Sequence, residues 1–146
     1  MTREEKWDRR FLDLARYISE WSKDPSTKTG AIIVDSKNRI VSVGYNGLPA
    51  GVDDLPERLA NRELKYKMIV HCERNALLFA KSSVEGCKLY TWPFMSCCPC
   101  AAMVISAGIK EVIAPISDNP RWVDDFDLAR ILFKEAGVKL KLIPLS

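Results

Sequence analysis

The chain has 146 residues, of which 47% are hydrophobic and 28% are charged, and its formal net charge at pH 7 is +3. This length suits a single domain over residues 1–146 with a core of its own. The mild positive charge suits an anionic substrate but falls short of the basic surface of a dedicated nucleic-acid binder. We therefore expect no nucleic acid as partner. No apolar run approaches the roughly 20 residues that span a bilayer, so we expect no membrane as partner either.

The N-terminus and the cysteines both favour a cytoplasmic protein. Residues 1–10 are charged and lack the apolar stretch of a signal peptide. The chain has five cysteines, an odd number, and three of them, Cys97, Cys98 and Cys100, stand within four positions. A disulfide framework spreads its cysteines along the chain, whereas a cytosolic cluster of this kind is typical of a metal site.

A capping box predicts the beginning of the first helix. Thr2 and Glu5 have the spacing at which each side chain bonds the backbone N–H of the other. Apolar residues then recur at helical spacing as far as Trp21. The run Asp24-Pro25-Ser26 predicts the end of this helix, because its residue types favour turns.

The rest of the chain alternates between strand and helix patterns. Short β-branched runs predict strands, and apolar residues at helical spacing predict helices. Gly108 and Gly137 each follow a helical run at the position where a left-handed residue ends a helix. The expected strands are 30–35, 40–45, 89–92, 111–116 and 138–143, and the further expected helices are 57–67, 71–81, 97–107 and 124–136.

This order of elements predicts an α/β fold, a three-layer α/β/α sandwich around a mixed five-stranded sheet. The first two strands are separated by a short turn at Asn38, which favours a hairpin. Each of the last three strands is joined to the next by a helix, so these strands should be parallel. Helices should then cover both faces of the sheet.

His71, Cys97 and Cys100 are the predicted ligands of one zinc ion. His71 is the one histidine of the chain and begins a predicted helix, and the two cysteines form a C-x-x-C at the start of another. Helix N-termini stabilise thiolates, and a catalytic zinc site leaves its fourth position to water. We interpret Cys98 as a buried thiol, but as a fourth ligand it would make the site a closed, structural one.

Glu73 is the predicted catalytic proton carrier. The pattern H-x-E followed by P-C-x-x-C is the signature of zinc nucleobase deaminases. Here Ser96 replaces the proline and Pro99 lies between the two cysteines, which leaves the ligand spacing intact. Zinc makes hydroxide available at neutral pH to attack C4 of a cytosine ring. A carboxylate two residues from His71 can then carry protons to N3 and to the departing ammonia.

Several segments resemble the deoxycytidylate (dCMP) deaminases, over about Asp24 to Pro115. They are residues 24–31 (DPSTKTGA), 44–49 (GYNGLP), 71–76 (HCERNA), the Cys97/Cys100 pair and 107–112 (AGIKEV). The resemblance implies a cytidine deaminase-like fold and the hydrolysis of dCMP to dUMP and ammonia, which supplies thymidylate synthesis. It also implies activation by dCTP, inhibition by dTTP, Mg²⁺ on the bound triphosphate and a homo-oligomer, often a hexamer.

The resemblance further implies a set of substrate- or effector-binding residues. They are Ser26 and Lys28, where the family approaches phosphate; Asn46, which matches the G-Y-N-G asparagine; Asn75, which helps to shape the site; and Arg121 and Trp122, in a loop that faces substrate or effector. Some members carry a second, structural zinc ion. Because residues 51–70 contain neither His nor Cys, we expect one zinc ion per chain.

Other readings stay open at this point. A deaminase of another cytosine or adenine compound, either a nucleoside or a nucleic acid, would share the zinc motif. A nucleic-acid deaminase favours a broad basic surface with exposed aromatic side chains, whereas the basic residues here are interspersed with acidic ones. A structural zinc module is the alternative outside the enzymes. Individually, Lys28 could be a solvated charge, Asn75 a helix-surface residue and Arg121-Trp122 a packed loop.

Overall fold

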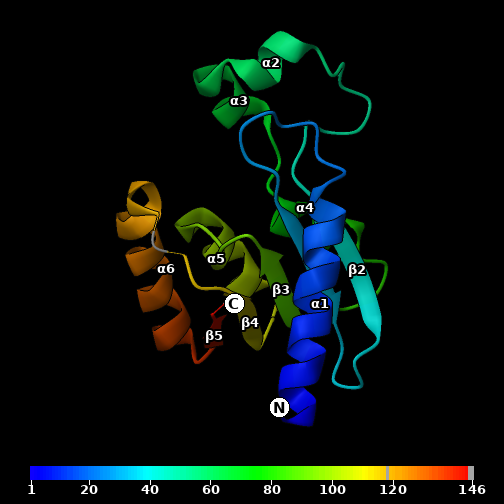
Figure 1. Ribbon diagram of the computed structural model, residues 1–146, viewed down its shortest axis with the longest axis vertical. Helices are drawn as coiled ribbons and strands as arrows, with labels where there is room; N and C mark the ends of the chain where they lie inside the picture. Colours follow the sequence, from blue (N-terminus) through cyan, green and yellow to red (C-terminus); the bar gives the residue numbers. More distant parts are fainter. Residues whose placement is uncertain (118, 145–146) are drawn as a thin grey trace.

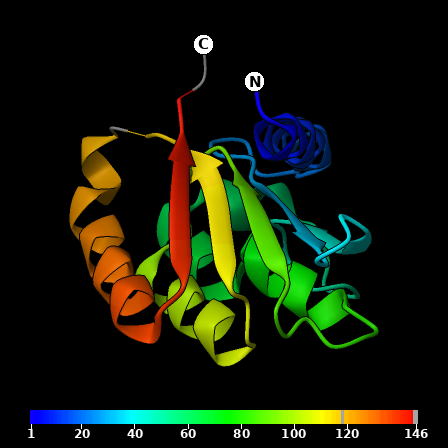
Figure 2. The same cartoon turned by 90° about the horizontal axis from the view of Figure 1, so that it is seen from below.

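Five strands form one mixed sheet, and helices lie on both of its faces (Figures 1 and 2). The computed structural model describes residues 1–117 and 119–144. The helices are α1 (Arg3–Ser19), α2 (Pro56–Ala60), α3 (Arg62–Met68), α4 (Cys72–Phe79), α5 (Cys98–Ser106), the 3-10 turn η1 (Pro120–Trp122) and α6 (Val123–Ala136). The strands are β1 (Gly30–Val34), β2 (Ile40–Tyr45), β3 (Lys88–Trp92), β4 (Glu111–Pro115) and β5 (Lys139–Ile143).

The sheet has the strand order β2-β1-β3-β4-β5. Strand β1 pairs antiparallel with both β2 and β3, whereas β3, β4 and β5 run parallel to one another. The predicted hairpin and the predicted parallel strands are therefore confirmed. Parallel pairing follows from the helices α5 and α6, each of which returns the chain to the edge where the next strand begins.

The core lies in two layers, one on each face of the sheet. Helix α1 alone covers one face, where Phe11 and Ile18 pack against β1 residues such as Ile32. Helices α4, α5 and α6 cover the other face, which receives the alternate β1 residues Ala31 and Ile33. All five residues of β1 are buried, as expected for a strand with helices on both faces. The predicted three-layer sandwich is confirmed.

Capping chemistry explains where the elements end. The capping box between Thr2 and Glu5 is present at the start of α1. Gly108 and Gly137 have the positive φ angles of 91° and 75° that were predicted at two helix ends. None of the helices in the described part of the chain is long and apolar enough to cross a membrane.

The prediction of a single helix over 57–67 is wrong: two helices, α2 and α3, meet at Asn61. The Asn61 backbone is extended, with φ −84° and ψ 108°, and its side-chain oxygen accepts the Leu64 N–H at 3.1 Å. Asparagine favours such caps over helix interiors, because its side chain competes for nearby backbone groups. The chain therefore turns between α2 and α3 instead of continuing as one helix.

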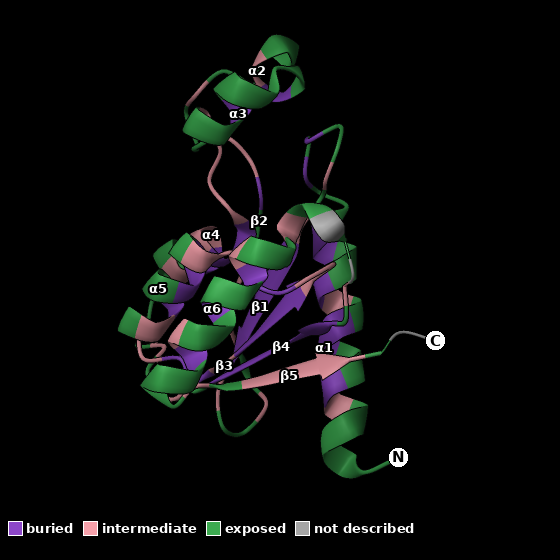
Figure 3. Cartoon of the chain, turned by 90° about the vertical axis from the view of Figure 1, so that its left-hand side faces the viewer, coloured by how far each residue is buried: buried purple, intermediate pink, exposed green. Residues whose placement is uncertain are grey.

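Residues 47–70 form an arm that stands away from the sheet (Figures 1 and 3). Its neck is closed by two mutual backbone hydrogen bonds between Gly47 and Val70, with N···O distances of 3.1 and 2.8 Å. Helices α2 and α3 lie at its far end. Immediately after the neck the chain enters α4 at His71, so the arm leads directly into the candidate metal site.

Candidate active site

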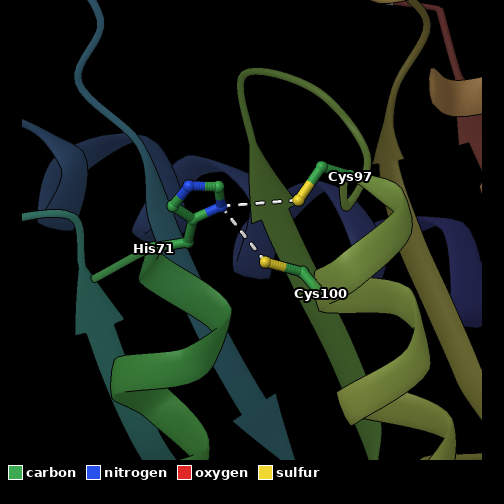
Figure 4. A group of neighbouring side chains, drawn as sticks. All are labelled: His71, Cys97 and Cys100. Carbon is green, nitrogen blue, oxygen red and sulfur yellow. Dashed lines mark hydrogen bonds between the residues drawn. The ribbon is translucent and has the colours of Figure 1, made fainter. Parts of the chain in front are cut away.

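Two helix N-termini bring the three predicted ligands together. His71 is the N-cap residue of α4, Cys97 is the N-cap residue of α5, and Cys100 lies in the first turn of α5. The His71 Nδ1 atom is 3.1 Å from Cys100 Sγ and 3.4 Å from Cys97 Sγ (Figure 4). All three ligand atoms lie within 4.8 Å of one another.

This arrangement fits a zinc ion. With Zn–N bonds of about 2.0–2.1 Å and Zn–S bonds of about 2.3 Å, a tetrahedral site holds its ligand atoms roughly 3.5 Å apart. One imidazole and two thiols are donors that zinc prefers. Within residues 1–117 and 119–144, the group of side chains that could hold a metal ion consists of His71, Cys97 and Cys100 and does not include Cys98. Three protein ligands are the number found in catalytic zinc sites.

Cys98 has a different environment from its neighbours. Its side chain is half-buried, so the buried thiol expected from the sequence is only partly enclosed. Its backbone N–H donates to the Asp125 carboxylate on α6 at 2.8 Å. A free N–H at the start of α5 thereby finds an acceptor in a distant helix, and α6 is tied to the start of α5.

The ligand side chains share protons with one another. A hydrogen bond from Cys100, supported by one from His71, lowers the pKa of Cys97 to about 5. The same contact raises the pKa of Cys100 above its ordinary value, and the hydrogen bond with Cys97 raises the pKa of His71. The lowered pKa of Cys97 favours the thiolate, which is the form in which sulfur binds a metal.

Arg74 also contacts a predicted ligand. Its Nε–H donates to Cys100 Sγ at 3.3 Å, so a guanidinium charge faces the thiol pair. Arg74 stands one residue after Glu73 on α4, and its side chain is half-buried. A cation in this position compensates part of the negative charge that two thiolates bring to the site.

Glu73 lies in the first turn of α4, two residues after His71. Its side chain is buried, at 5% exposure, and it lines the same cavity as His71 and Cys97. The Cys72 thiol donates to Glu73 Oε1 at 3.3 Å. Burial and the charge of Glu73 raise the pKa of Cys72 well above its ordinary value, so this thiol stays protonated and keeps donating.

Close packing between β2 and α4 fixes the position of His71 and Glu73. Gly44 on β2 lies so near α4 that a Cβ atom there would be 2.5 Å from both the Ala76 nitrogen and the Cys72 carbonyl oxygen. Only glycine permits this approach of two backbones. Ser42 on the same strand donates its hydroxyl to the Ala76 carbonyl at 2.7 Å, which adds a polar tie between strand and helix.

The cavity is lined by both aromatic and charged side chains. The aromatic wall includes Phe94, whose ring centroid is 6.3 Å from that of Trp122 and 5.6 Å from that of Phe126. Lys65 and Tyr66 from the arm and Arg121 from η1 also line the cavity. The Asp24–Thr29 loop, including Ser26, provides another side.

The structure brings most of the predicted binding residues to this cavity. Ser26, Asn46, Arg121 and Trp122 line it, whereas Lys28 and Asn75 are not among its lining residues. The buried Asn46 amide is already engaged, because its oxygen accepts the Thr29 N–H and its nitrogen donates to the Thr27 carbonyl, both at 2.9 Å.

The two residues outside the cavity have other surroundings. Lys28 is exposed. The Asn75 amide donates to the Tyr45 carbonyl at 2.8 Å and so ties α4 to the end of β2. The resulting role for Asn75 is to hold two elements of the site together.

Sequence reasoning missed Lys65, Tyr66, Arg74 and Asp125. The polar pattern of residues 57–67 predicted a surface helix, yet Lys65 is buried, at 7% exposure. For Arg74, its position beside the H-x-E motif was an available signal. The other three depend on contacts between distant segments, for which a single sequence carries no local signal.

Fold and site together define the class as zinc-dependent deaminases. The model of the cytidine and deoxycytidylate deaminase zinc-binding region matches residues 5–115, and the chain belongs to this family. A deaminase of Aliivibrio fischeri that is otherwise uncharacterised is 43% identical over 97% of this chain and 96% of its own length. Human deoxycytidylate deaminase is also 43% identical, over 95% of this chain and 81% of its own length.

A solved structure supports the fold. The dCMP deaminase from cyanophage S-TIM5, in its apo form, superposes with a TM-score of 0.74 over 98% of this chain and all of its own, at 23% identity. The family model and the relatives at 43% identity confirm the resemblance to the deoxycytidylate deaminases, and the chain is a deaminase enzyme.

Proposed function

We propose that this enzyme hydrolyses dCMP to dUMP and ammonia. The observation that carries the proposal is one cavity lined by Glu73 and the His71/Cys97 pair and also by the cationic side chains Lys65 and Arg121. A pyrimidine base suits the aromatic wall, and a phosphate suits the cations. Relatives named deoxycytidylate deaminase, at 43% identity, support the same substrate.

In the proposed mechanism, His71, Cys97 and Cys100 hold zinc and Glu73 moves protons. When bound, zinc supplies the Lewis-acid activation of the water that attacks C4 of the cytosine ring. The Glu73 carboxylate takes a proton from that water and delivers it to N3. After attack, Glu73 takes the remaining hydroxyl proton and passes it to the exocyclic amino group, which leaves as ammonia while the C4 carbonyl forms.

The aromatic wall orients the base in this mechanism. Phe94, Trp122 and Phe126 pack together on one side of the cavity, so a planar ring can stack or pack edge-on against them. Glu73 lines the same cavity as these rings, and apolar surroundings strengthen the electrostatic contact of a carboxylate with a bound substrate. Asn46 and Asn75 act in the proposal by holding the loops that surround the site.

We further propose the regulation and assembly that the family resemblance implies. In this proposal dCTP, with Mg²⁺ on its phosphates, activates the enzyme, and dTTP inhibits it. The working form is a homo-oligomer, a hexamer, in the cytoplasm, where its dUMP feeds thymidylate synthesis. Light scattering on the purified protein, with and without each triphosphate, tests the assembly.

The substrate test is the loss of ultraviolet absorbance at the cytosine band. We expect turnover of dCMP to exceed that of deoxycytidine, cytidine and a cytosine-containing oligonucleotide, and to respond to dCTP and dTTP. The zinc-loaded protein serves for all four substrates, and a chelated sample is the control. If the oligonucleotide or a free nucleoside is turned over faster than dCMP, that compound and not dCMP is the substrate.

A further inference from the structure

The helix that presents two of the predicted ligands has no N-terminal cap of its own. Cys97 is the N-cap residue of α5, and its side chain makes no capping hydrogen bond. This position usually holds Ser, Thr, Asp or Asn, whose side-chain oxygen accepts a free N–H of the first turn. Sulfur is only a weak acceptor, and the proposed role of the Cys97 thiolate is to bind zinc. A separate acceptor must therefore cap α5.

A carboxylate of α6 supplies this acceptor. Asp125 Oδ2 accepts the backbone N–H of Cys98, the first residue of α5, at 2.8 Å and from 27 positions further along the chain. Pro99, the next residue, has no N–H to offer, so this contact satisfies one of the few free donors at the helix start. Negative charge is also favourable at a helix N-terminus. Asp125 thus takes the place of the missing N-cap side chain.

Core packing holds this carboxylate in position. Asp125 is half-buried, and the next residue, Phe126, is buried in the same core cluster as Ala101 of α5. The helices α5 and α6 lie side by side (Figure 1). Phe126 also lines the catalytic cavity together with Cys97. The first turn of α6 is therefore fixed next to the metal site.

The capped N–H lies where a small shift would exchange one thiol for another. The Cys97 backbone is extended, with φ −66° and ψ 165°, and its carbonyl accepts the Ala101 N–H at 2.8 Å, so α5 begins directly after it. A start one residue later would place Cys98 at the N-cap position. Because Asp125 holds the Cys98 N–H inside the first turn, Cys97 stays at the N-cap position beside His71.

We propose that Asp125 is a positioning residue of the metal site, which caps α5 from α6 and so holds Cys97, and not Cys98, in place to bind zinc. This inference rests on the zinc ligands of the proposed function. It adds a residue outside the H-x-E and C-x-x-C motifs that fixes the geometry of two ligands.

The test measures zinc affinity by competition with a chromophoric chelator, and cysteine alkylation by mass spectrometry. Neither readout requires turnover of dCMP. We expect Asp125→Ala to weaken zinc binding roughly threefold to tenfold, within the range for the loss of a helix cap, and to speed alkylation of Cys97 in the zinc-loaded protein. A merely structural role would lower the melting temperature of the metal-free protein and leave the zinc affinity as in the wild type.

Two further variants separate the hydrogen bond from the charge. Asp125→Asn keeps an acceptor oxygen and should retain most of the wild-type affinity. Asp124→Ala is the matched control, because Asp124 is an exposed acid in the same first turn of α6; its affinity should equal that of the wild type. If Asp125→Ala does not fold, Asp125→Ser, whose side chain is shorter, serves with the same expected result.

The outcomes distinguish this inference from the proposed ligand set. A folded Asp125→Ala or Asp125→Ser variant with zinc affinity within about twofold of the wild type would overturn the role of Asp125, as would an equal loss of affinity in Asp124→Ala. The ligand set stands in both cases if zinc protects Cys97 and Cys100 from alkylation in the wild type. Zinc that leaves Cys97 as reactive as in the metal-free wild type would overturn the ligand set, and this inference with it.

Discussion

The metal end of the molecule and the arm are built in opposite ways. At the metal end, His71 and Cys97 begin helices that pack on central strands, and the ligands of each helix stand within a few residues of its start. In the arm, Lys65 lines the cavity and contacts Asp24, which lies 41 positions earlier in the chain. The comparison teaches that the predicted metal ligands are placed by helix starts, whereas the buried lysine of the arm is placed by a contact between segments far apart in the sequence.

The largest predicted effect is a loss of catalysis at the metal end. Glu73→Gln should lower kcat for dCMP by roughly 10²–10⁴-fold, because an amide cannot carry the proton. Zinc content, measured by atomic emission, and the circular dichroism spectrum should stay as in the wild type. A variant that retains most of its kcat would remove Glu73 as the proton carrier.

A pair of glycine substitutions compares how closely the backbone is packed in the two regions, through their effect on the free energy of unfolding. Gly44→Ala should lower the free energy of unfolding by about 3 kcal/mol, the upper range for overpacking, because the new Cβ meets the α4 backbone at 2.5 Å. Gly47→Ala, at the neck of the arm, adds a Cβ atom with no atom within 4 Å and should change little. Urea unfolding measures both, and equal losses would contradict the close packing of β2 on α4.

The contact of Arg74 with a predicted ligand gives an intermediate effect. Arg74→Met should weaken zinc binding by roughly 10–100-fold, the range for residues that support metal ligands, because Cys100 loses its hydrogen bond at 3.3 Å. Competition with a chromophoric chelator measures the affinity. Arg74→Lys, which keeps the charge but not the planar donor, is the control and should lie between the two. Unchanged affinity in Arg74→Met would show that the contact is incidental.

The smallest predicted effect concerns the docking of the arm in acid. Because the folded-state pKa of Asp24 is lowered, its stabilising contribution is complete above its ordinary pKa of about 3.9 and is lost as the pH falls through the folded value. Protease cleavage within residues 47–70 should therefore increase below about pH 4. An acid-active protease such as pepsin reports this, and Asp24→Asn should flatten the response. A response that is unchanged in this variant would assign the acid effect elsewhere.

Sequence patterns were sufficient for the sheet and for the grouping of His71, Cys97 and Cys100, and the physical reasons are local. Strand runs separated by helices determine parallel order, and C-x-x-C spacing at a helix start brings two thiols to one point. The break at Asn61 was missed because the polar run around it continues a helical pattern. The burial of Lys65 and the full use of the Asn46 amide were missed because both depend on the Asp24–Thr29 loop, which is distant in sequence.

The most direct test of the central claim, that this is a catalytic three-ligand zinc site, is zinc titration of the metal-free protein with ammonia release from dCMP as the readout. We predict that activity rises in proportion to zinc and saturates at one ion per chain, while the circular dichroism spectrum of the metal-free protein is already that of a folded α/β domain. A metal-free protein that is unfolded, and that zinc folds without any release of ammonia, would contradict the account and indicate a structural zinc site instead.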